Sequence, residues 1–346
     1  MKRIGFLSFG HWQDIPGSRV RTAGDSLSQS LDLAVAAEEV GVDGAFFRVH
    51  HFAQQLAAPF PLLSAIGART SRIELGTGVL DLRYENPLDL AENAAATDLL
   101  SGGRLHLGVS RGSPETVVDG ATRFGYPATA EHPQGGDTRA KAAEFLAAIA
   151  GEGLATPNPR TAPPGTLQRI EPHAPGLGER IWWGASTRDT AEWAASLGMN
   201  LMSSTLMLED TGVPYDELQA EQIARFRAAW AAAGHGWEPR VAVTRSVIPL
   251  TEDEDREYFG LSGTREAKDQ VGRLEGRNAR SGRSYIGEPD VIAAELSRDA
   301  AVQAADTLLV TVPNMLGVDY NVRLLDTIVR EIKPALGSVY GGRPGS

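Results

Sequence analysis

The sequence contains no cysteine among its 346 residues. Without thiols the chain can form no disulfide, no cysteine-ligated zinc or iron–sulfur site and no cysteine nucleophile. Redox chemistry is still open to it, but a bound cofactor must supply that chemistry because the protein's own sulfur cannot.

Long apolar runs and excess positive charge are also missing. No stretch approaches the roughly 18–20 consecutive apolar residues of a membrane helix, and the short run in residues 1–9 lacks the length and cleavage site of a signal peptide. The chain has 33 Lys and Arg against 44 Asp and Glu, a net charge of −11. Nucleic acids and anionic membranes are polyanions, so they bind so acidic a protein poorly. We therefore expect a cytoplasmic protein that binds neither of them.

Strand and helix patterns alternate along most of the chain. Strand patterns occupy residues 4–9, 45–49, 73–80, 104–109, 181–184, 199–203, 241–249 and 307–312. Helical patterns follow at residues 26–40, 60–70, 87–100, 137–150, 187–197, 215–233, 289–301 and 322–336. We expect Ser26 to cap the first helix, and Asn86 and Pro87 to begin the third.

This alternation implies parallel strands joined by right-handed crossovers. Eight such units predict an α/β fold of the (β/α)₈ (TIM) barrel type. An open, doubly wound sheet is the alternative, and it fits this number of strands less well.

Two long insertions interrupt the repeat. Residues 151–178 contain six prolines and are predicted to form a surface excursion, because proline disrupts helices and central strands. Residues 251–287 are rich in Arg, Glu and Gly and are predicted to form a lid loop. Strand patterns of the same repeat lie on both sides of each insertion, so we expect a single domain over residues 1–346.

Active sites of (β/α)₈ barrels lie at the C-terminal ends of the strands. Polar candidates at those ends are His50, His51, Thr77, Gly78, Asp81, Ser110, Arg111, Ser186, Thr187 and Arg245. Ser186 and Asp189 form a capping-box pattern at a helix start, which suits a phosphate but also opens many helices that bind nothing. Arg111, and Arg139 near the start of a later helix, are candidates for bidentate bonds to phosphate, or for ordinary pairing with carboxylates.

The His50-His51 pair suggests a general base or a polar contact to a cofactor ring. A metal site is less consistent with it, because adjacent residues of a strand point in opposite directions and no acidic residue flanks the pair. Gly76-Thr77-Gly78 lacks the third glycine of a dinucleotide fingerprint. It indicates either close approach of a flat ligand or a bulge in the strand.

These segments together resemble the bacterial luciferase-like, flavin-dependent monooxygenases. The most specific stretch is residues 98–112, and Val49-His50-His51-Phe52 is similar to a family segment that ends in Glu-His-His-Phe. Further similar stretches are residues 70–79, 85–92, 183–186 and 286–292. The resemblance covers most of the predicted barrel, and the two insertions match poorly.

The resemblance implies a homodimeric barrel that binds FMN or the deazaflavin F420, with no metal. By position, Arg111, Arg139, Ser186 and Thr187 would hold the phosphate, and Thr190, one turn on, is a further candidate. Ser110 and Ala185 would also contact the cofactor. Thr77, Gly78 and Val79 would lie against the isoalloxazine ring, at a place where the family often has a non-prolyl cis peptide. His50 would be the catalytic histidine and would also contact the flavin.

The implied reaction is a two-component monooxygenation. A separate flavin reductase supplies reduced FMN, O₂ adds to it, and the flavin peroxide oxidises a small organic substrate. Two alternatives stay open, namely F420-dependent hydride transfer and a flavin-binding subunit without turnover. The sequence departs from the family where Val49 replaces Glu, where a phenylalanine replaces a tryptophan before that segment, and where Ser110 replaces the reactive cysteine of true luciferases.

Overall fold

A computed structural model describes residues 2–112, 117–131, 136–160, 165–209, 212–261, 268–274 and 277–337. Eight parallel strands form a closed barrel, because β12 pairs with β1 and β6 pairs with β8. In order around the barrel they are β1 (Arg3–Ser8), β2 (Gly44–Phe47), β3 (Glu74–Asp81), β4 (Leu105–Ser110), β5 (Ile181–Ala185), β6 (Asn200–Ser203), β8 (Val241–Pro249) and β12 (Thr307–Thr311). The (β/α)₈ prediction is therefore confirmed, and each predicted strand corresponds to one of these eight.

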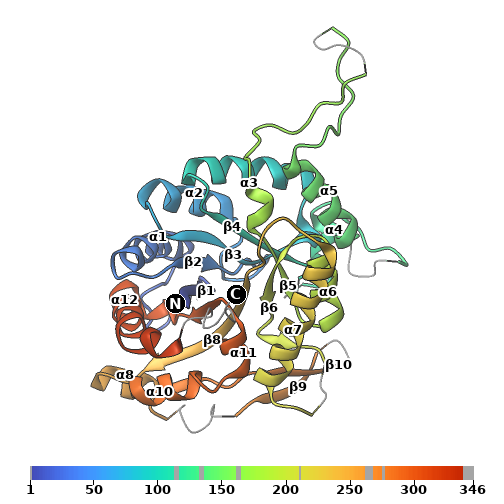
Figure 1. Ribbon diagram of the computed structural model, residues 1–346. Helices are drawn as coiled ribbons and strands as arrows, with labels where there is room; N and C mark the ends of the chain where they lie inside the picture. Colours follow the sequence, from blue (N-terminus) through green and yellow to red (C-terminus); the bar gives the residue numbers. More distant parts are fainter. Residues whose placement is uncertain are drawn as a thin grey trace, which may run out of the picture.

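Helices surround the barrel (Figure 1). They are α1 (Ala23–Glu39), α2 (Pro59–Arg69), α3 (Pro87–Ser101), α4 (Gly120–Arg123), α5 (Thr138–Ala150), α6 (Arg188–Ser196), α7 (Tyr215–Ala233), α8 (Asp253–Phe259), α10 (Pro289–Leu296), α11 (Ala300–Ala304) and α12 (Val318–Thr327). No helix within the described ranges is both long and apolar enough to span a membrane.

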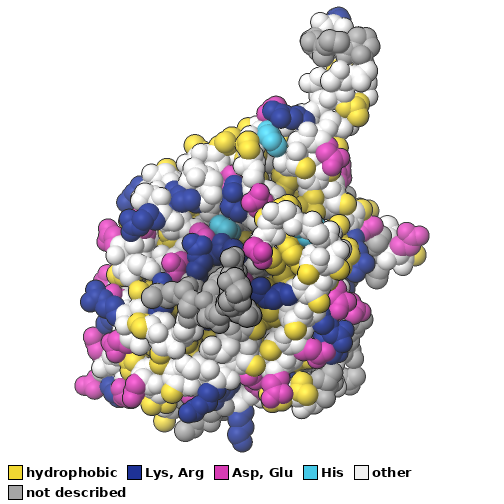
Figure 2. Space-filling model, viewed as in Figure 1, with side chains coloured by type: hydrophobic (Ala, Val, Ile, Leu, Met, Phe, Trp, Pro, Cys, Tyr) yellow, Lys and Arg dark blue, Asp and Glu magenta, His cyan; other side chains and the backbone are white. Residues whose placement is uncertain are grey.

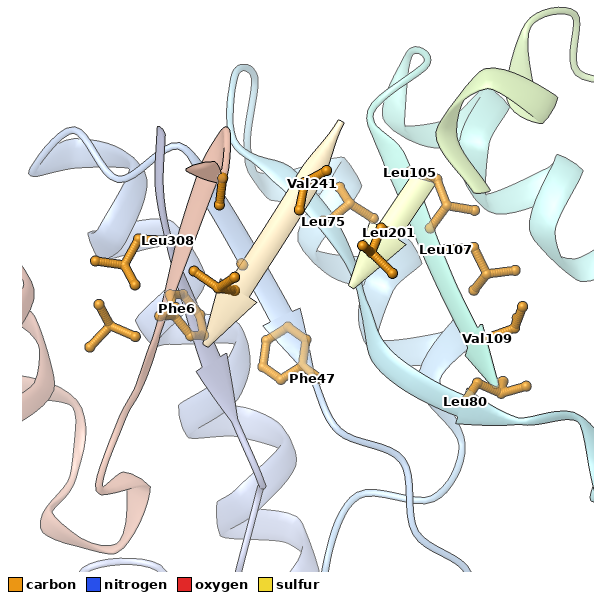
Figure 3. Close-up of a cluster of buried hydrophobic side chains, with 14 of the residues drawn as sticks. Phe6, Phe47, Leu75, Leu80, Leu105, Leu107, Val109, Leu201, Val241 and Leu308 are labelled. Carbon is orange, nitrogen blue, oxygen red and sulfur yellow. The ribbon is translucent and has the colours of Figure 1, made fainter. Parts of the chain in front are cut away.

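Successive side chains along each strand point to opposite faces of the barrel wall, so the apolar side chains form two layers. Outward-facing side chains form the main core between strands and helices, and Figure 3 shows Phe6, Phe47, Leu75, Leu107 and Leu308 among them. Inward-facing side chains form a smaller cluster inside the barrel: Leu7, Phe46, Trp182, Met202, Ala242 and Leu309. The parity of a residue within its strand thus decides whether its side chain faces the helices or the barrel axis.

Strands β3 and β4 approach too closely for a side chain at two glycines. A Cβ on Gly76 would lie 1.9 Å from the His106 carbonyl oxygen, and one on Gly108 would lie 2.3 Å from the Thr77 carbonyl oxygen. The register of the two strands shifts between Thr77 and Leu80, so the predicted strand irregularity is present. The Gly78–Val79 peptide is cis, as the family resemblance implies for this position.

Helix starts differ from the predicted caps at two places. Helix α1 begins earlier than expected because Thr22, not Ser26, caps it in a capping box with Asp25. Helix α6 is capped by Thr187, whose hydroxyl accepts from the Thr190 amide, so the predicted Ser186 capping box does not form. Asn86 caps α3 as predicted, followed by Pro87.

The single helix predicted at residues 289–301 is two helices. Helix α10 ends at Leu296, and Asp299 begins α11 by accepting from the Val302 amide. The apolar spacing continues across the break, whereas the capping aspartate ends the hydrogen-bond ladder of one helix and begins another.

The insertion at residues 251–287 has more secondary structure than the predicted loop. It contains α8, a β-hairpin of β9 (Gln270–Leu274) and β10 (Arg277–Ser281) that pairs with β7 (Leu206–Met207), and β11 (Tyr285–Gly287), which pairs with β8. Residues 262–267 and 275–276 of the predicted lid lie outside the described residues.

The proline-rich insertion extends away from the barrel as the green arm in Figure 1. Its two sides pair at Ala155 and Gln168, and its Glu171–Pro172 peptide is cis. The predicted excursion is thus present in the described part of residues 151–178, of which residues 161–164 lie outside the description.

Candidate active site

A cavity of about 530 Å³ opens at the C-terminal ends of the barrel strands. Its volume lies in the range of small-molecule and cofactor sites. Its lining residues include Leu7, Phe9, Arg48, His50, Gly78, Val79, Asp81, Ser110, Arg111, Arg139, Trp183, Gly184, Ser186, Thr187, Thr190, Met202, Ser203, Ser204 and Leu309. No cluster of three metal-ligating side chains occurs in the part of the chain that the structure describes.

Most of the predicted site residues line this one cavity. They are His50, Gly78, Val79, Ser110, Arg111, Arg139, Ser186, Thr187 and Thr190. Thr77 and Ala185 are not among the lining residues. The Thr77 hydroxyl is buried and donates to the Gly108 carbonyl at 2.6 Å, and the Ala185 carbonyl accepts from the Gln222 side chain at 3.2 Å. Both residues therefore support the strands around the cavity.

One end of the cavity is rich in hydrogen-bond donors, which are guanidinium groups and hydroxyls. Arg111 follows β4, Arg139 lies in the first turn of α5, and Thr187 and Thr190 lie at the start of α6. The Arg139 guanidinium packs over the Trp193 ring at 5.0 Å, which restrains a long side chain that is otherwise exposed. Guanidinium groups and hydroxyls in this number are the donors that a phosphate needs.

The backbone amides at the start of α6 offer fewer free N–H donors to this end of the cavity than the sequence suggested. The Arg188 amide donates to Glu209 Oε2 at 3.1 Å, and the Thr190 amide donates to the Thr187 hydroxyl at 3.3 Å. Because these two amides have protein partners, guanidinium groups and hydroxyls are the main donors to an anion here.

The Trp183 indole is a buried donor next to this end of the cavity. The indole nitrogen of Trp183 is buried and has no hydrogen-bond partner among the described residues. Its ring packs edge-on against Trp193 with centroids 4.8 Å apart, and Trp183 lines the cavity. Trp183 belongs to the outer core between strands and helices, so this nitrogen is not a donor to the cavity. The donors that fit a bound anion such as a phosphate are the side chains of Arg111, Arg139, Thr187 and Thr190.

The middle of the cavity has a flat, closely packed wall. A Cβ on Gly184 would lie 3.2 Å from the Val79 side chain, and one on Gly78 would lie 2.8 Å from Leu7. Small residues thus keep the wall at Gly78 and Val79 free of projecting side chains, which suits the face of a planar ring system.

His50 follows β2 and lines the same cavity. Its amide donates to the Leu56 carbonyl at 2.9 Å, and the preceding Val49 amide donates to Val79 at 3.3 Å. The His50 side chain is largely buried and lines the cavity. The Val49 side chain belongs to the outer core, so the position at which the resemblance implies Glu directs its side chain toward the helices.

His11 lies near Arg48 and His50, whose charges act on its imidazole. Burial lowers the pKa of His11 below its ordinary value of 6.5, and the charges of Arg48 and His50 lower it further. The His11 ring stacks in parallel on Phe9, with centroids 5.7 Å apart.

The lining also contains residues that the sequence did not single out. Arg48 has the same strand parity as Phe46 and His50, so alternation along β2 was a signal that could have identified it. Ser203 and Ser204 follow β6 and are held by α7. The Gln222 side chain accepts from the Ser203 hydroxyl at 2.6 Å, and Gln219 donates to both serines. Nothing in the local sequence indicates these long-range contacts.

Asp81, at the end of β3, forms hydrogen bonds with the Arg83 side chain. Both of its carboxylate oxygens accept from Arg83, the shortest contact being 2.6 Å. The chain passes close by at Gly112, whose Cβ would lie 2.0 Å from the carboxylate and whose φ is +84°. Glycine is therefore required in the turn that follows Arg111.

Arg245 lies outside this cavity. The residue is buried between barrel and helices, where it bonds Asp299 at 2.7 and 3.0 Å. Of the aromatic side chains near the strand ends, Trp183 lines the cavity, whereas Trp12, Phe52 and Tyr84 are not among its lining residues.

The sequence was compared with family profiles and with known proteins. Residues 1–309 match the sequence profile of a family described as luciferase-like monooxygenase. The chain is 30% identical over 110 residues to the oxygenase component of a flavin-dependent trigonelline monooxygenase of Acinetobacter baylyi, covering 31% of this chain and 30% of that protein. It is 42% identical over 92 residues to an F420-dependent glucose-6-phosphate dehydrogenase of Nakamurella multipartita, covering 25% of this chain and 27% of that protein. These alignments therefore span less than a third of either relative.

A solved structure extends the likeness over the full length at the level of the fold. The oxygenating constituent of 3,6-diketocamphane monooxygenase of Pseudomonas putida, in complex with FMN, superposes with a TM-score of 0.68 at 16% identity. The superposition covers 97% of this chain and 98% of that one.

Proposed function

The chain belongs to the luciferase-like monooxygenase family, and from this premise we propose that it is the oxygenase component of a two-component, FMN-dependent monooxygenase. The proposal includes a separate flavin reductase that supplies reduced FMN, a small organic substrate, and a homodimeric enzyme. One observation carries it. A single cavity combines a donor-rich end, a flat wall at Gly78–Val79 and the imidazole of His50.

In this proposal Arg111, Arg139, Thr187 and Thr190 hold the phosphate of FMN, with Ser110 and Ser186 beside them. The ring system lies along Gly78 and Val79. When bound, reduced FMN supplies the electrons with which O₂ is activated, so that one oxygen atom enters the substrate and the other leaves as water.

The protein's own contribution is to orient, to exclude water and to move protons. Leu7, Phe9, Met202 and Leu309 form an apolar wall that keeps water from the reacting atoms. A ring nitrogen of His50 exchanges a proton with the reacting oxygen, a role that suits imidazole near neutral pH. Ser203 and Ser204, fixed by α7, orient the substrate or the ring edge through their polar groups.

F420-dependent hydride transfer is the second candidate. It is favoured by the identity to the F420-dependent dehydrogenase of Nakamurella, and the same donor-rich end could take the phosphate of F420. We favour FMN because the segment His50-His51-Phe52 is more similar to the FMN-using branch of the family.

Titration of the apoprotein with reduced FMN and with F420, each under anaerobic conditions, tests the choice. We expect saturable binding of reduced FMN, followed on admission of air by O₂ uptake that exceeds the peroxide released once a substrate is present. Tight binding of F420 with no response to reduced FMN would reverse the assignment. Release of peroxide alone, whatever substrate is offered, would instead favour a flavin-binding subunit without turnover.

A further inference from the structure

The proposed position of the flavin ring assigns the opposite side of the cavity to the substrate. The flat wall at Gly78–Val79 belongs to β3, and β8 is the fourth strand from β3 in either direction around the closed barrel. Strand β8 therefore lies across the barrel from the flat wall, with β6 and β12 as its neighbours. A flavin ring that lies with one face against β3 turns its other face toward these three strands.

The inward-facing residues of β6, β8 and β12 that line the cavity are Met202, Thr244 and Leu309, and we call them the β8 wall. Met202 and Leu309 belong to the apolar cluster inside the barrel. Thr244 shares the inward parity of Ala242, which is two positions earlier in β8, and Leu309 is its register partner on β12. The charged side chains among the described lining residues lie elsewhere, at the ends of β2, β3 and β4 and in α5.

Thr244 supplies the polar group of the β8 wall. The residue is half-buried, and its hydroxyl forms no hydrogen bond with any residue that the structure describes. Nearby hydroxyls do have partners. The Ser204 hydroxyl, just past β6, accepts from the Leu206 amide at 3.1 Å, and the Ser203 hydroxyl donates to the Gln222 side chain on α7. A threonine hydroxyl in this situation can both donate to and accept from a ligand.

We infer that Thr244 determines substrate specificity by binding the oxygen of a hydroxyl or ketone group on a neutral, otherwise apolar molecule. The apolar part of the substrate packs against Met202 and Leu309, across the flavin ring from Gly78–Val79. The β8 wall disfavours a charged substrate, because it has no charged side chain to offset the cost of removing that charge from water. The inference rests on the proposed function, since it takes the position of the flavin ring from it.

Isosteric pairs of neutral probes test the role of this hydroxyl. Phenol is paired with toluene, and acetophenone with α-methylstyrene, so that each pair exchanges an oxygen group for a methyl or methylene group of similar size. Benzoate is the anionic probe. Dissociation constants are measured by calorimetry for the full-length protein, with saturating FMN and without it, and the variants are T244V, T244S and T166V. Thr166 is exposed in the proline-rich insertion and does not line the cavity, so T166V is the matched control.

We expect T244V to weaken the binding of phenol or acetophenone by about three- to tenfold, the effect of one neutral hydrogen bond, and to change the binding of toluene and α-methylstyrene by less than about twofold. T244S keeps the hydroxyl and restores the binding of the oxygen-containing probe, whereas a purely steric role would affect both members of a pair alike. T166V binds every probe as wild type does, and benzoate binds more weakly than acetophenone. All variants retain the FMN affinity of wild type, which also shows that they are folded.

Several outcomes would contradict the inference. An equal change for both members of each pair in T244V would reduce Thr244 to a steric contact. Tighter binding of benzoate than of phenol and acetophenone, or no measurable binding of any neutral probe, would exclude the neutral substrate class. A loss of FMN affinity in T244V as large as that in R111M would place Thr244 in the cofactor site. Failure of FMN to bind wild type would refute the proposed function, and the phenol–toluene comparison without FMN would still decide the role of Thr244.

Discussion

At the scale of single residues, position within a strand decides what a side chain can do. Arg48 and His50 share the inward parity of β2 and line the cavity, whereas Arg245 faces outward from β8 and is bonded to Asp299. The sequence indicated which strand ends carry polar residues, and most of the predicted cofactor residues do line the cavity. It did not indicate Ser203 and Ser204, because their positions depend on α7, which is distant in sequence.

His50 is the residue whose replacement should separate chemistry from binding. We predict that H50Q lowers kcat about 10²–10⁴-fold, the usual contribution of a general acid–base group, while the Kd for reduced FMN changes by less than about threefold. H51F is the matched control, because His51 packs against the Tyr84 ring at a centroid distance of 4.3 Å and is not among the described lining residues. Unchanged turnover in H50Q would remove His50 from the mechanism.

His106, at the opposite end of the barrel, should make stability depend on pH. Burial lowers its pKa from 6.5 to about 3, and the Trp182 indole donates to its Nδ1 at 3.0 Å. Between these pH values the unfolded chain binds a proton that the folded protein does not, so stability falls as the pH is lowered below 6.5.

The largest slope that this histidine can give is about 1.4 kcal/mol per pH unit. We predict that the free energy of unfolding in urea, compared at pH 7 and pH 5, decreases by about 1–2 kcal/mol less in H106Q than in wild type. The lowered pKa of Glu74 acts in a more acidic range, below its ordinary value of 4.5, and does not mask the effect. Equal decreases in the two proteins would contradict this account of His106.

At the scale of elements, the strands and most helices follow from apolar periodicity, and the exceptions have local causes. The break between α10 and α11 is produced by Asp299, which caps α11 and also bonds Arg245 and the Tyr285 hydroxyl. Likewise β9 and β10 have few apolar residues, so the pairing of β10 with β9 and with β7 could not be predicted from a strand pattern.

The Arg245–Asp299 pair should be structural, even though Arg245 is near the end of a barrel strand. Both side chains are about 3% exposed, so R245M would leave a buried carboxylate without its cation. We predict a loss of about 3–5 kcal/mol in the free energy of unfolding. FMN affinity, measured at a temperature where the variant is folded, should stay as in wild type.

R256M is the control for that measurement, because the Arg256–Glu288 pair is about half exposed and should contribute less than about 1 kcal/mol. A destabilisation by R245M no larger than that of R256M would show that the buried pair does not stabilise α11 on the barrel.

At the scale of the whole molecule, the barrel brings together residues from widely separated segments. The cavity takes Phe9 from the first strand region and Leu309 from the last, and closure of the barrel makes them neighbours. Basic and acidic side chains are interspersed on the face shown in Figure 2, so the excess of acidic residues does not form a single charged patch on that face. The concentration of donors inside the cavity therefore distinguishes the proposed site from the surface.

Because the chain has no cysteine, no thiol can line the cavity. Ser110, for which the resemblance implies a reactive thiol in true luciferases, lines the cavity, and its hydroxyl accepts from the Gly112 amide at 2.8 Å. Any redox function of this barrel must therefore come from a cofactor in the cavity.

The central claim is that the cavity binds a flavin whose phosphate lies at Arg111. The most direct measurement compares the Kd of reduced FMN with that of reduced riboflavin, which lacks the phosphate, for wild type and R111M. We predict that wild type binds FMN about 100-fold or more tightly than riboflavin, and that R111M reduces this ratio by about tenfold or more, as expected for charge-assisted bonds to phosphate. Equal binding of FMN and riboflavin by wild type, or an unchanged ratio in R111M, would contradict the claim.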